Sequence, residues 1–246
     1  TVNRSQEVFD ALSNKGAKVS LLHSRFTKRD RKCLESKILN FALSNETGIW
    51  VTTQLVEASL DIDFDLLYTE MSTLDSQFQR YGRCNRKGEK SVDQANVHVL
   101  TRDVSGVSRH KRAVYHYDIY ERSIKLLKNF KSDLLLESVK HQMIKDLYNE
   151  ENLKETAFKK EFDDTLEQLK NRPHYQTSKQ HAQDLLRDIH QVQAVPIQFV
   201  ENPDFQKILK KWIHASTKTE KRKYRKQIES YSVSVNEWRA RKIGLT

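Results

Sequence analysis

The feature that most constrains the fold is the alternation of short apolar segments with helical patterns over the first hundred residues. Four apolar segments have the length and composition of strands: 18–22, 48–53, 65–70 and 95–101. Three helical patterns alternate with them: 5–14, about 27–43, and one that starts near residue 74. This alternation, with short connections, predicts a parallel sheet covered by helices. We expect Gly16 to end the first helix and Thr27 to cap the second.

The pattern changes at about Arg109 to long, polar and largely helical stretches. Two apolar segments in this part, 195–200 and 230–235, are typical of isolated strands. We therefore predict a parallel-sheet α/β domain over residues 1–108 and a mostly helical, basic accessory domain over 109–246. Because such a sheet usually begins with a strand and this chain begins with a helix, we expect further sequence upstream.

Basic residues exceed acidic ones, and the excess is unevenly distributed. The chain has 43 Lys and Arg against 33 Asp and Glu, a net charge of +10. Residues 1–101 contain 14 basic and 13 acidic residues, so the excess lies beyond them. Segment 207–226 alone has nine basic residues, one acid, and the aromatic residues Trp212 and Tyr224. The pattern is typical of single-strand binding, but a solvated helix with its aromatics in the core explains it too.

Cysteine usage and hydropathy indicate a cytoplasmic protein without a membrane span. Cys33 and Cys84 have no spacing typical of a zinc site or a disulfide framework. No stretch approaches the roughly 20 apolar residues that cross a bilayer, and the first residues lack a signal-peptide core.

The strongest chemical motif is Q-R-Y-G-R-C-N-R at residues 79–86. If the helix continues through it, Gln79, Arg83 and Arg86 share one face, because they are spaced i, i+4 and i+7. Planar guanidinium groups bind phosphate oxygens bidentately and stabilise the charge of phosphoryl transfer. A basic helix face paired with surface acids is the alternative.

A second motif, V-T-T-Q-L-V-E-A-S-L-D-I-D-F-D at residues 51–65, begins at a strand end, where open α/β sheets bind ligands. Thr53 and Gln54 are candidates for binding a nucleic-acid phosphate. Asp61 is a candidate for accepting from a nucleotide ribose or for ordering the arginines. Asp61, Asp63 and Asp65 together also suggest a metal site. Alternating positions on extended backbone need not converge, however, so we predict no metal ligands.

A third motif, H-S-R-F-T-K-R-D-R, places His23, Ser24 and Arg25 at the end of the first strand. These side chains suit phosphate contacts that do not read sequence, although a lone histidine is more often structural. We expect His23, Thr53 and Glu70 to lie at the same sheet edge.

Taken in this order and at these distances, the three motifs resemble motifs IV, V and VI of superfamily 2 helicases. The form T-Q-x-x-E-x-S-L-D-I-D-F-D is specifically similar to the CRISPR-associated helicase-nuclease of type I systems. The start, T-V-N-R-S-Q-E-V-F, resembles the entry to that family's second RecA-like domain. The likeness covers about residues 1–101 and is looser beyond.

The resemblance implies a motor that hydrolyses ATP with Mg²⁺ between two RecA-like domains and moves along single-stranded DNA, serving antiviral CRISPR interference. It implies that Arg83 and Arg86 are catalytic and that Gln79 and Asp61 bind ATP. Five residues would bind nucleic acid: His23, Ser24, Arg25, Thr53 and Gln54. The implied partners are single-stranded DNA, the first RecA-like and nuclease domains on the same or another chain, and a CRISPR RNA-guided surveillance complex. The accessory domain is implied to cap the DNA channel.

The sequence also departs from the family pattern. It has no G-x-x-x-x-G-K-[ST], no D-E-x-[DH] and no His-Asp dipeptide. ATP and Mg²⁺ would then be bound mainly by the first RecA-like domain, and the nuclease metals elsewhere, so we expect this chain alone to be inactive. The alternatives are another superfamily 2 DNA or RNA helicase, or a non-enzymatic module that binds nucleic acid or protein.

Overall fold

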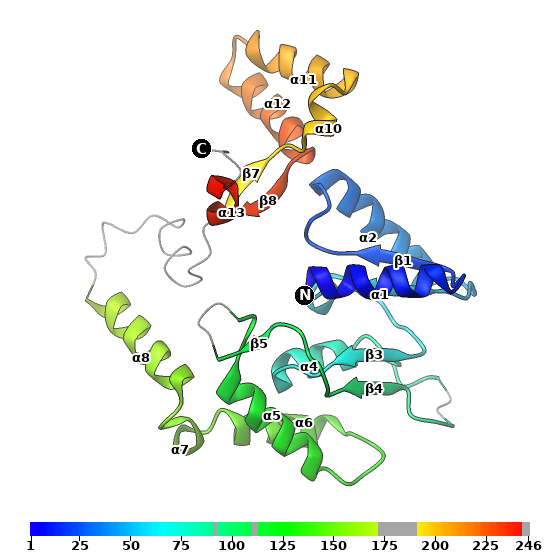
Figure 1. Cartoon of the computed structure of the whole chain (residues 1–246), viewed down its shortest axis with the longest axis vertical. Coiled ribbons are helices and arrows are strands. Elements are labelled where there is room, and N and C mark those ends of the chain that lie inside the picture. The colour runs from blue at the N-terminus through cyan, green and yellow to red at the C-terminus, as the bar shows by residue number, and fades with distance from the viewer. Residues whose placement is uncertain (91–92, 110–112, 172–190, 243–246) are drawn as a thin grey trace. The chain divides into compact units, whose positions relative to one another are not determined.

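The chain consists of helices and short strands that form two compact units (Figure 1). The computed structural model describes residues 1–90, 93–109, 113–171 and 191–242. Unit 1 comprises Thr1 and Val56–Ser178, and unit 2 comprises Val2–Leu55 and Lys179–Thr246. The division into domains 1–108 and 109–246 stays a prediction.

The first part of unit 2 follows the expected order of elements: α1 (Val2–Asn14), β1 (Val19–Leu22), α2 (Lys28–Ala42) and β2 (Ile49–Thr52). Strands β1 and β2 pair in parallel, with Val19 opposite Ile49. The chain leaves α1 through Gly16, whose φ of +78° is a conformation that favours glycine. Thr27 caps α2, since its Oγ1 accepts from the Asp30 N–H at 3.1 Å. Both boundary predictions are confirmed.

The second part of unit 2 contains six described elements, two of which, β7 and β8, form an antiparallel pair. They are β7 (Gln191–Ala194), α10 (Ile197–Val200), α11 (Pro203–Ile213), α12 (Lys218–Ser230) and β8 (Val233–Asn236), followed by α13 (Glu237–Lys242). The predicted strand at 195–200 is wrong, because β7 ends earlier and the segment becomes a helical turn. A short apolar run cannot be assigned to strand or helix by periodicity alone. The strand predicted at 230–235 is present as β8, shifted toward the C-terminus.

Unit 1 contains a second parallel pair followed by helices. Its elements are α3 (Leu55–Ser59), β3 (Leu67–Glu70), α4 (Leu74–Tyr81), β4 (Val97–Leu100), β5 (Val107–Ser108), β6 (Tyr115–His116), α5 (Tyr117–Asn129), α6 (Glu137–Leu147), α7 (Glu150–Leu153) and α8 (Ala157–Lys170). Strands β3 and β4 run parallel, with Leu67 opposite Val97. The pair β5–β6 is also parallel.

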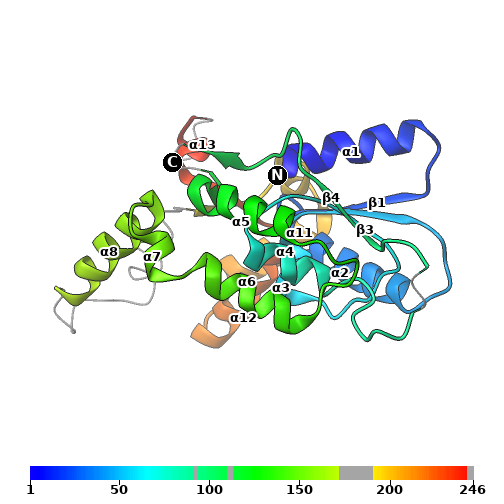
Figure 2. The same ribbon diagram turned by 90° about the horizontal axis from the view of Figure 1, so that it is seen from below.

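The core of unit 1 lies where α5 and α6 pack together and α4 packs on α6 (Figures 1 and 2). It is built from apolar side chains that are almost fully buried: Met71, Leu74, Ile119, Tyr120, Met143, Leu147 and Leu153. Burial of this apolar surface is the main favourable term in folding. The core therefore joins the helix of the Q-R-Y-G-R-C-N-R motif to the helices that follow the sheet.

The α/β fold class, with parallel strands, intervening helices and a helix-rich remainder, is confirmed. In the described residues the strands form separate two-stranded sheets, β1–β2 in unit 2 and β3–β4 in unit 1. His23 and Thr53 belong to unit 2 and Glu70 to unit 1, so their common sheet edge stays a prediction. Within the described ranges, no helix combines the length and apolarity needed to cross a bilayer.

Candidate functional site

The motif at 79–86 spans a helix end rather than one helical face. Helix α4 ends at Tyr81, and Gly82 is its C-cap. Gln79 is therefore the only one of the three expected donors that lies in α4, where it is exposed. The prediction that Arg83 and Arg86 share a helical face with Gln79 is wrong, because the backbone leaves the helix before either arginine.

Beyond α4, the backbone runs beside the aspartate-rich segment 61–65. Phe64 donates its N–H to the carbonyl of Arg83 at 2.9 Å and accepts from the N–H of Asn85 at 3.0 Å. These two bonds form a parallel bridge between Phe64 and Cys84. These bonds hold segment 61–65 beside residues 83–86, so the polar side chains of two motifs about 20 residues apart lie next to each other.

Asp61 and Asp63 both bind Arg86. Asp61 forms an ion pair with the Arg86 guanidinium, and Asp63 Oδ1 accepts from the Arg86 backbone N–H at 2.8 Å. The side chains of Arg86 and Asp61 are 46% and 88% exposed, respectively, so the pair lies at the surface. An exposed pair is weak, so Arg86 can exchange this partner for a stronger anion.

Arg83 lies deeper than Arg86. Its Nη2 donates to the backbone carbonyl of Glu57 at 2.6 Å. Its Nε is buried and has no hydrogen-bond partner among the described residues. Burial lowers the pKa of the Arg83 guanidinium, and the nearby Arg86 lowers it further, whereas Asp61 raises it. A buried donor without an acceptor is costly, and an anionic ligand oxygen is a group that would satisfy it.

Arg80 was not among the expected site residues, yet its guanidinium makes more hydrogen bonds than that of Arg83 or Arg86 among the described residues. Its Nε pairs with Glu57 Oε1 at 2.6 Å, and its Nη1 donates to Thr69 Oγ1 and the Glu70 carbonyl, both at 2.9 Å. Its Nη2 donates to the Tyr115 hydroxyl. Burial raises the pKa of Glu57, and Arg80 opposes this. Because adjacent residues of a motif are alike in type, no sequence signal separated this structural arginine from its neighbours.

A lysine and an asparagine complete the loop after the arginines. Asn85, in the left-handed region at φ +47°, bonds the Lys90 backbone with both side-chain groups, at 3.0 and 3.1 Å. Lys90 Nζ bonds Asp65 Oδ1 at 2.9 Å and the Asp63 carbonyl at 3.0 Å. The aspartates are thus tied to cations of the next motif. The described part of the chain holds no group of three potential metal ligands.

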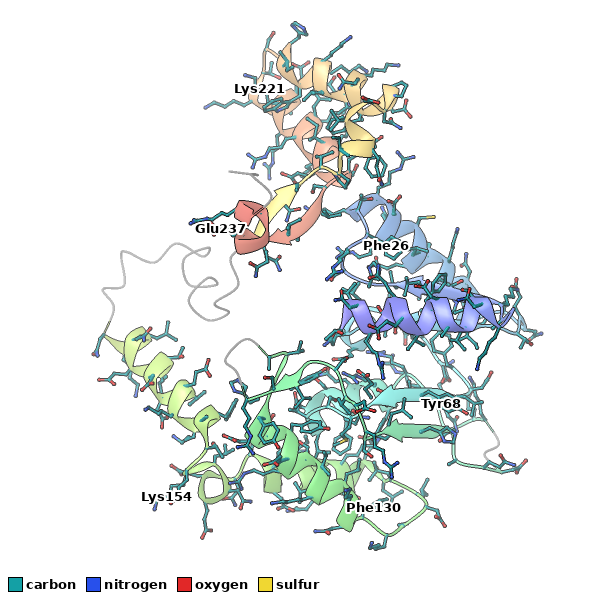
Figure 3. All side chains as sticks on the ribbon, viewed as in Figure 1. Phe26, Tyr68, Phe130, Lys154, Lys221 and Glu237 are labelled. Atoms are coloured by element: carbon teal, nitrogen blue, oxygen red, sulfur yellow. The ribbon has the colours of Figure 1, made fainter. Side chains whose placement is uncertain are left out.

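The candidate nucleic-acid residues lie in unit 2. His23 is buried and stacks on Phe26, labelled in Figure 3, with ring centroids 4.5 Å apart. Its Nδ1 accepts from the Arg25 N–H at 3.2 Å, and burial lowers its pKa. These contacts fit the structural alternative for His23.

The other four candidates are more accessible. Ser24 and Arg25 are exposed, and Thr53 and Gln54 are half-buried. The Thr53 N–H donates to the carbonyl of Leu22 at 3.3 Å, which fixes the end of β2 against the end of β1. Binding of nucleic acid by these residues stays a prediction.

The family comparison covers all three motifs. A family model described as the C-terminal region of the CRISPR-associated nuclease/helicase Cas3 matches residues 1–89. Residues 1–89 are therefore similar to this region of the Cas3 family. The Cas3 protein of Methanothermobacter thermautotrophicus is 31% identical over 134 residues, which are 54% of this chain and 16% of the relative. The Cas3 protein of Thermus thermophilus is 43% identical over 89 residues, 34% of this chain and 10% of the relative. The chain thus spans only a small part of the Cas3 relatives that it matches.

Solved structures show the same likeness. The structure of T. fusca Cas3 with ATP is 27% identical, with a TM-score of 0.53, and covers 69% of this chain and 22% of that chain. A crystal structure of a CRISPR-associated protein covers 96% of this chain and 31% of that one, with a TM-score of 0.66. At 21% identity, the second likeness concerns the fold alone.

Proposed function

We propose that this chain supplies the second RecA-like domain and the accessory domain of an ATP-dependent single-stranded-DNA translocase that works with a nuclease in CRISPR interference. A first RecA-like domain, on the same or another chain, would bind most of the ATP and its Mg²⁺. A CRISPR RNA-guided surveillance complex is the proposed recruiting partner. The observation that carries the proposal is the bonding of segment 61–65 to the arginine loop 83–90.

The proposed chemistry follows from the different settings of Arg83 and Arg86. Arg83 is held by the Glu57 carbonyl and has a buried Nε with no acceptor among the described residues. Arg86 is exposed, its guanidinium pairs with Asp61, and its backbone N–H bonds Asp63. Donors arranged before the ligand arrives stabilise developing phosphate charge with little reorganisation. We assign both arginines to the γ-phosphate, and we assign Gln79 and Asp61 to supporting the nucleotide.

The test is the DNA-stimulated ATPase of the complete helicase-nuclease that contains this chain. Arg83→Ala and Arg86→Ala should each lower the stimulated rate by about 10³-fold, the order found for arginines that contact a transferring phosphoryl group. Arg241→Ala is the matched control, because Arg241 is exposed and pairs with Glu237 much as Arg86 pairs with Asp61. It should leave the rate unchanged.

Full activity in both alanine variants would contradict the arginine assignment. The same assay separates the helicase classes. Single-stranded DNA should stimulate hydrolysis more than RNA of the same sequence, and the opposite order would favour an RNA helicase.

A further inference from the structure

A basic groove in unit 2 shares Lys28 and Arg29 with the third motif but contains none of the five residues implied to bind nucleic acid. It is formed by one face of α2 and one face of α12 and has a volume of about 520 Å³. Its lining residues are Lys28, Arg29, Lys32, Cys33 and Ser36 from α2, and Lys226, Glu229 and Ser230 from α12. On each helix these positions are spaced as residues of one face are. Two segments nearly 200 residues apart thus build one surface.

Contacts between the two segments hold the groove in shape. The Lys28 N–H donates to the carbonyl of Ser232 at 3.1 Å. Arg29 Nη1 donates to the Tyr231 hydroxyl at 2.9 Å, and the guanidinium lies 5.4 Å from that ring's centroid. Tyr231 is buried and packs against Phe205 with ring centroids 5.3 Å apart. Burial and hydrogen bonds at residues next to the groove therefore hold α2 against the C-terminal end of α12.

The groove has a strong excess of positive charge. Lys28, Lys32 and Lys226 are exposed, and none of them has an ion pair within the described ranges. Glu229 is the acid among the lining residues, and Arg225 neutralises it at 3.1 Å. The three lysines therefore keep their charge unpaired at the groove among the described residues.

The surrounding unit has the same sign of charge. Unit 2 contains 23 basic and 12 acidic residues, a net charge of +11, whereas unit 1 contains 20 and 21, a net charge of −1. Other exposed lysines, such as Lys221 (labelled in Figure 3), lie on α12. All of the chain's surplus positive charge thus belongs to the unit that carries the groove.

The lining indicates the class of ligand. The groove presents three lysines and one arginine held by the Tyr231 hydroxyl. Such groups bind phosphodiester oxygens without reading base sequence. We propose that the α2–α12 groove binds the phosphate backbone of DNA, as a contact separate from the motif residues His23, Ser24, Arg25, Thr53 and Gln54. DNA as the polyanion rests on the proposed function.

The test measures DNA affinity of the complete protein at several salt concentrations, by fluorescence anisotropy with a non-hydrolysable ATP analogue present. The variant is Lys28→Gln, Lys32→Gln and Lys226→Gln together. Each lost phosphate contact reduces the magnitude of the slope of log K against log salt by about 0.7 for single strands and about 0.9 for duplexes. We expect the triple variant to lose about 2 in slope if single-stranded DNA occupies the groove and about 2.7 if duplex DNA does. Separate single-stranded and duplex probes identify which form occupies it.

The matched control is Lys15→Gln, Lys37→Gln and Lys210→Gln, which removes the same charge from exposed positions of unit 2 outside the groove. A smaller slope in the groove variant alone supports the proposal. The proposal is overturned if the groove variant, the control and the unmodified protein all have the same slope. An acidic protein surface would then be the partner to test.

The experiment also separates this proposal from the proposed function. If the groove variant binds DNA with the smaller slope yet shows full ATPase activity at saturating DNA, both proposals stand. If the unmodified protein binds DNA without any DNA-stimulated ATPase, the motor proposal fails, while the slopes still decide the groove.

Discussion

At the scale of single residues, Glu57 links two arginines that have different roles. Its carboxylate pairs with Arg80, and its backbone carbonyl accepts from Arg83. The side chains of Glu57 and Arg80 are only 8% and 16% exposed. Breaking a buried ion pair by removing one partner leaves an uncompensated charge, which costs far more than breaking an exposed pair. Arg80 is thus a structural residue on whose partner the proposed catalytic Arg83 depends.

Arg80→Ala should lower the free energy of unfolding by about 3–5 kcal/mol, as expected for an orphaned buried charge. Lys18→Ala is the control, because the Lys18–Glu46 pair has the same 2.6 Å distance but is 69% and 62% exposed. It should cost no more than about 1 kcal/mol. Urea denaturation of the chain measures both. Equal costs would show that burial of the Arg80–Glu57 pair has no energetic consequence.

The loss of unfolding free energy caused by Arg80→Ala should depend on pH. Burial already raises the pKa of Glu57, and Arg80 is the main group that lowers it. Without Arg80 the folded-state pKa rises further, so the folded state binds a proton more readily than the unfolded state does. The cost of Arg80→Ala should therefore be smaller at about pH 5 than at about pH 8.

At the scale of elements, α4 depends on α5 for its N-terminal cap. Thr73, at the N-cap position, makes no side-chain cap bond. The Leu74 N–H instead donates to the Ser123 hydroxyl at 3.1 Å, and both residues are fully buried. The Ser123 hydroxyl also donates to the Ile119 carbonyl at 2.7 Å. One hydroxyl of α5 therefore satisfies the start of the helix that leads to the arginine loop.

Ser123→Ala should cost about 1–3 kcal/mol of unfolding free energy, because it leaves a buried N–H without an acceptor. Thr165→Ala is the matched control: the Thr165 hydroxyl also bonds a carbonyl four residues earlier, at 2.7 Å, but lies on an exposed part of α8. Its effect should stay within about 0.5 kcal/mol. Thermal unfolding followed by circular dichroism compares the two. A cost for Ser123→Ala no larger than the control's would show that α4 needs no such cap.

The elements were predictable where local chemistry decides them, and less so where tertiary contacts do. Gly16 and Thr27 end and cap their helices as expected, because positive φ and N-capping are local requirements. The end of α4 was not predicted. The motif is typical of continuous helix. In the structure the Arg83 and Cys84 N–H groups still bond to the last turn, but the Arg83 carbonyl and the Asn85 N–H bond to Phe64. Partners that are distant in sequence, such as Phe64, Glu57 and Ser123, determine what spacing alone could not.

At the scale of the whole molecule, the sequence predicted the fold class better than it predicted how the site is built. Parallel pairing of β1 with β2 and of β3 with β4 follows from the alternation of strands and helices. The site is built differently from the expectation. Arg83 and Arg86 lie in a loop that is bonded to the aspartate segment. Asp61 pairs with Arg86, an arrangement that fits the ordering of the arginines rather than contact with a ribose.

The concentration of charge in unit 2 has a kinetic consequence. A surface field of one sign attracts an oppositely charged partner before contact, and its range falls to about 8 Å at physiological ionic strength. The association rate constant of the complete protein with single-stranded DNA, measured by stopped-flow fluorescence, should therefore fall steeply as salt is raised. With an oligonucleotide whose backbone is uncharged methylphosphonate, the association rate constant should hardly change as salt is raised. Equal salt dependence for both strands would mean that the +11 of unit 2 does not guide the encounter.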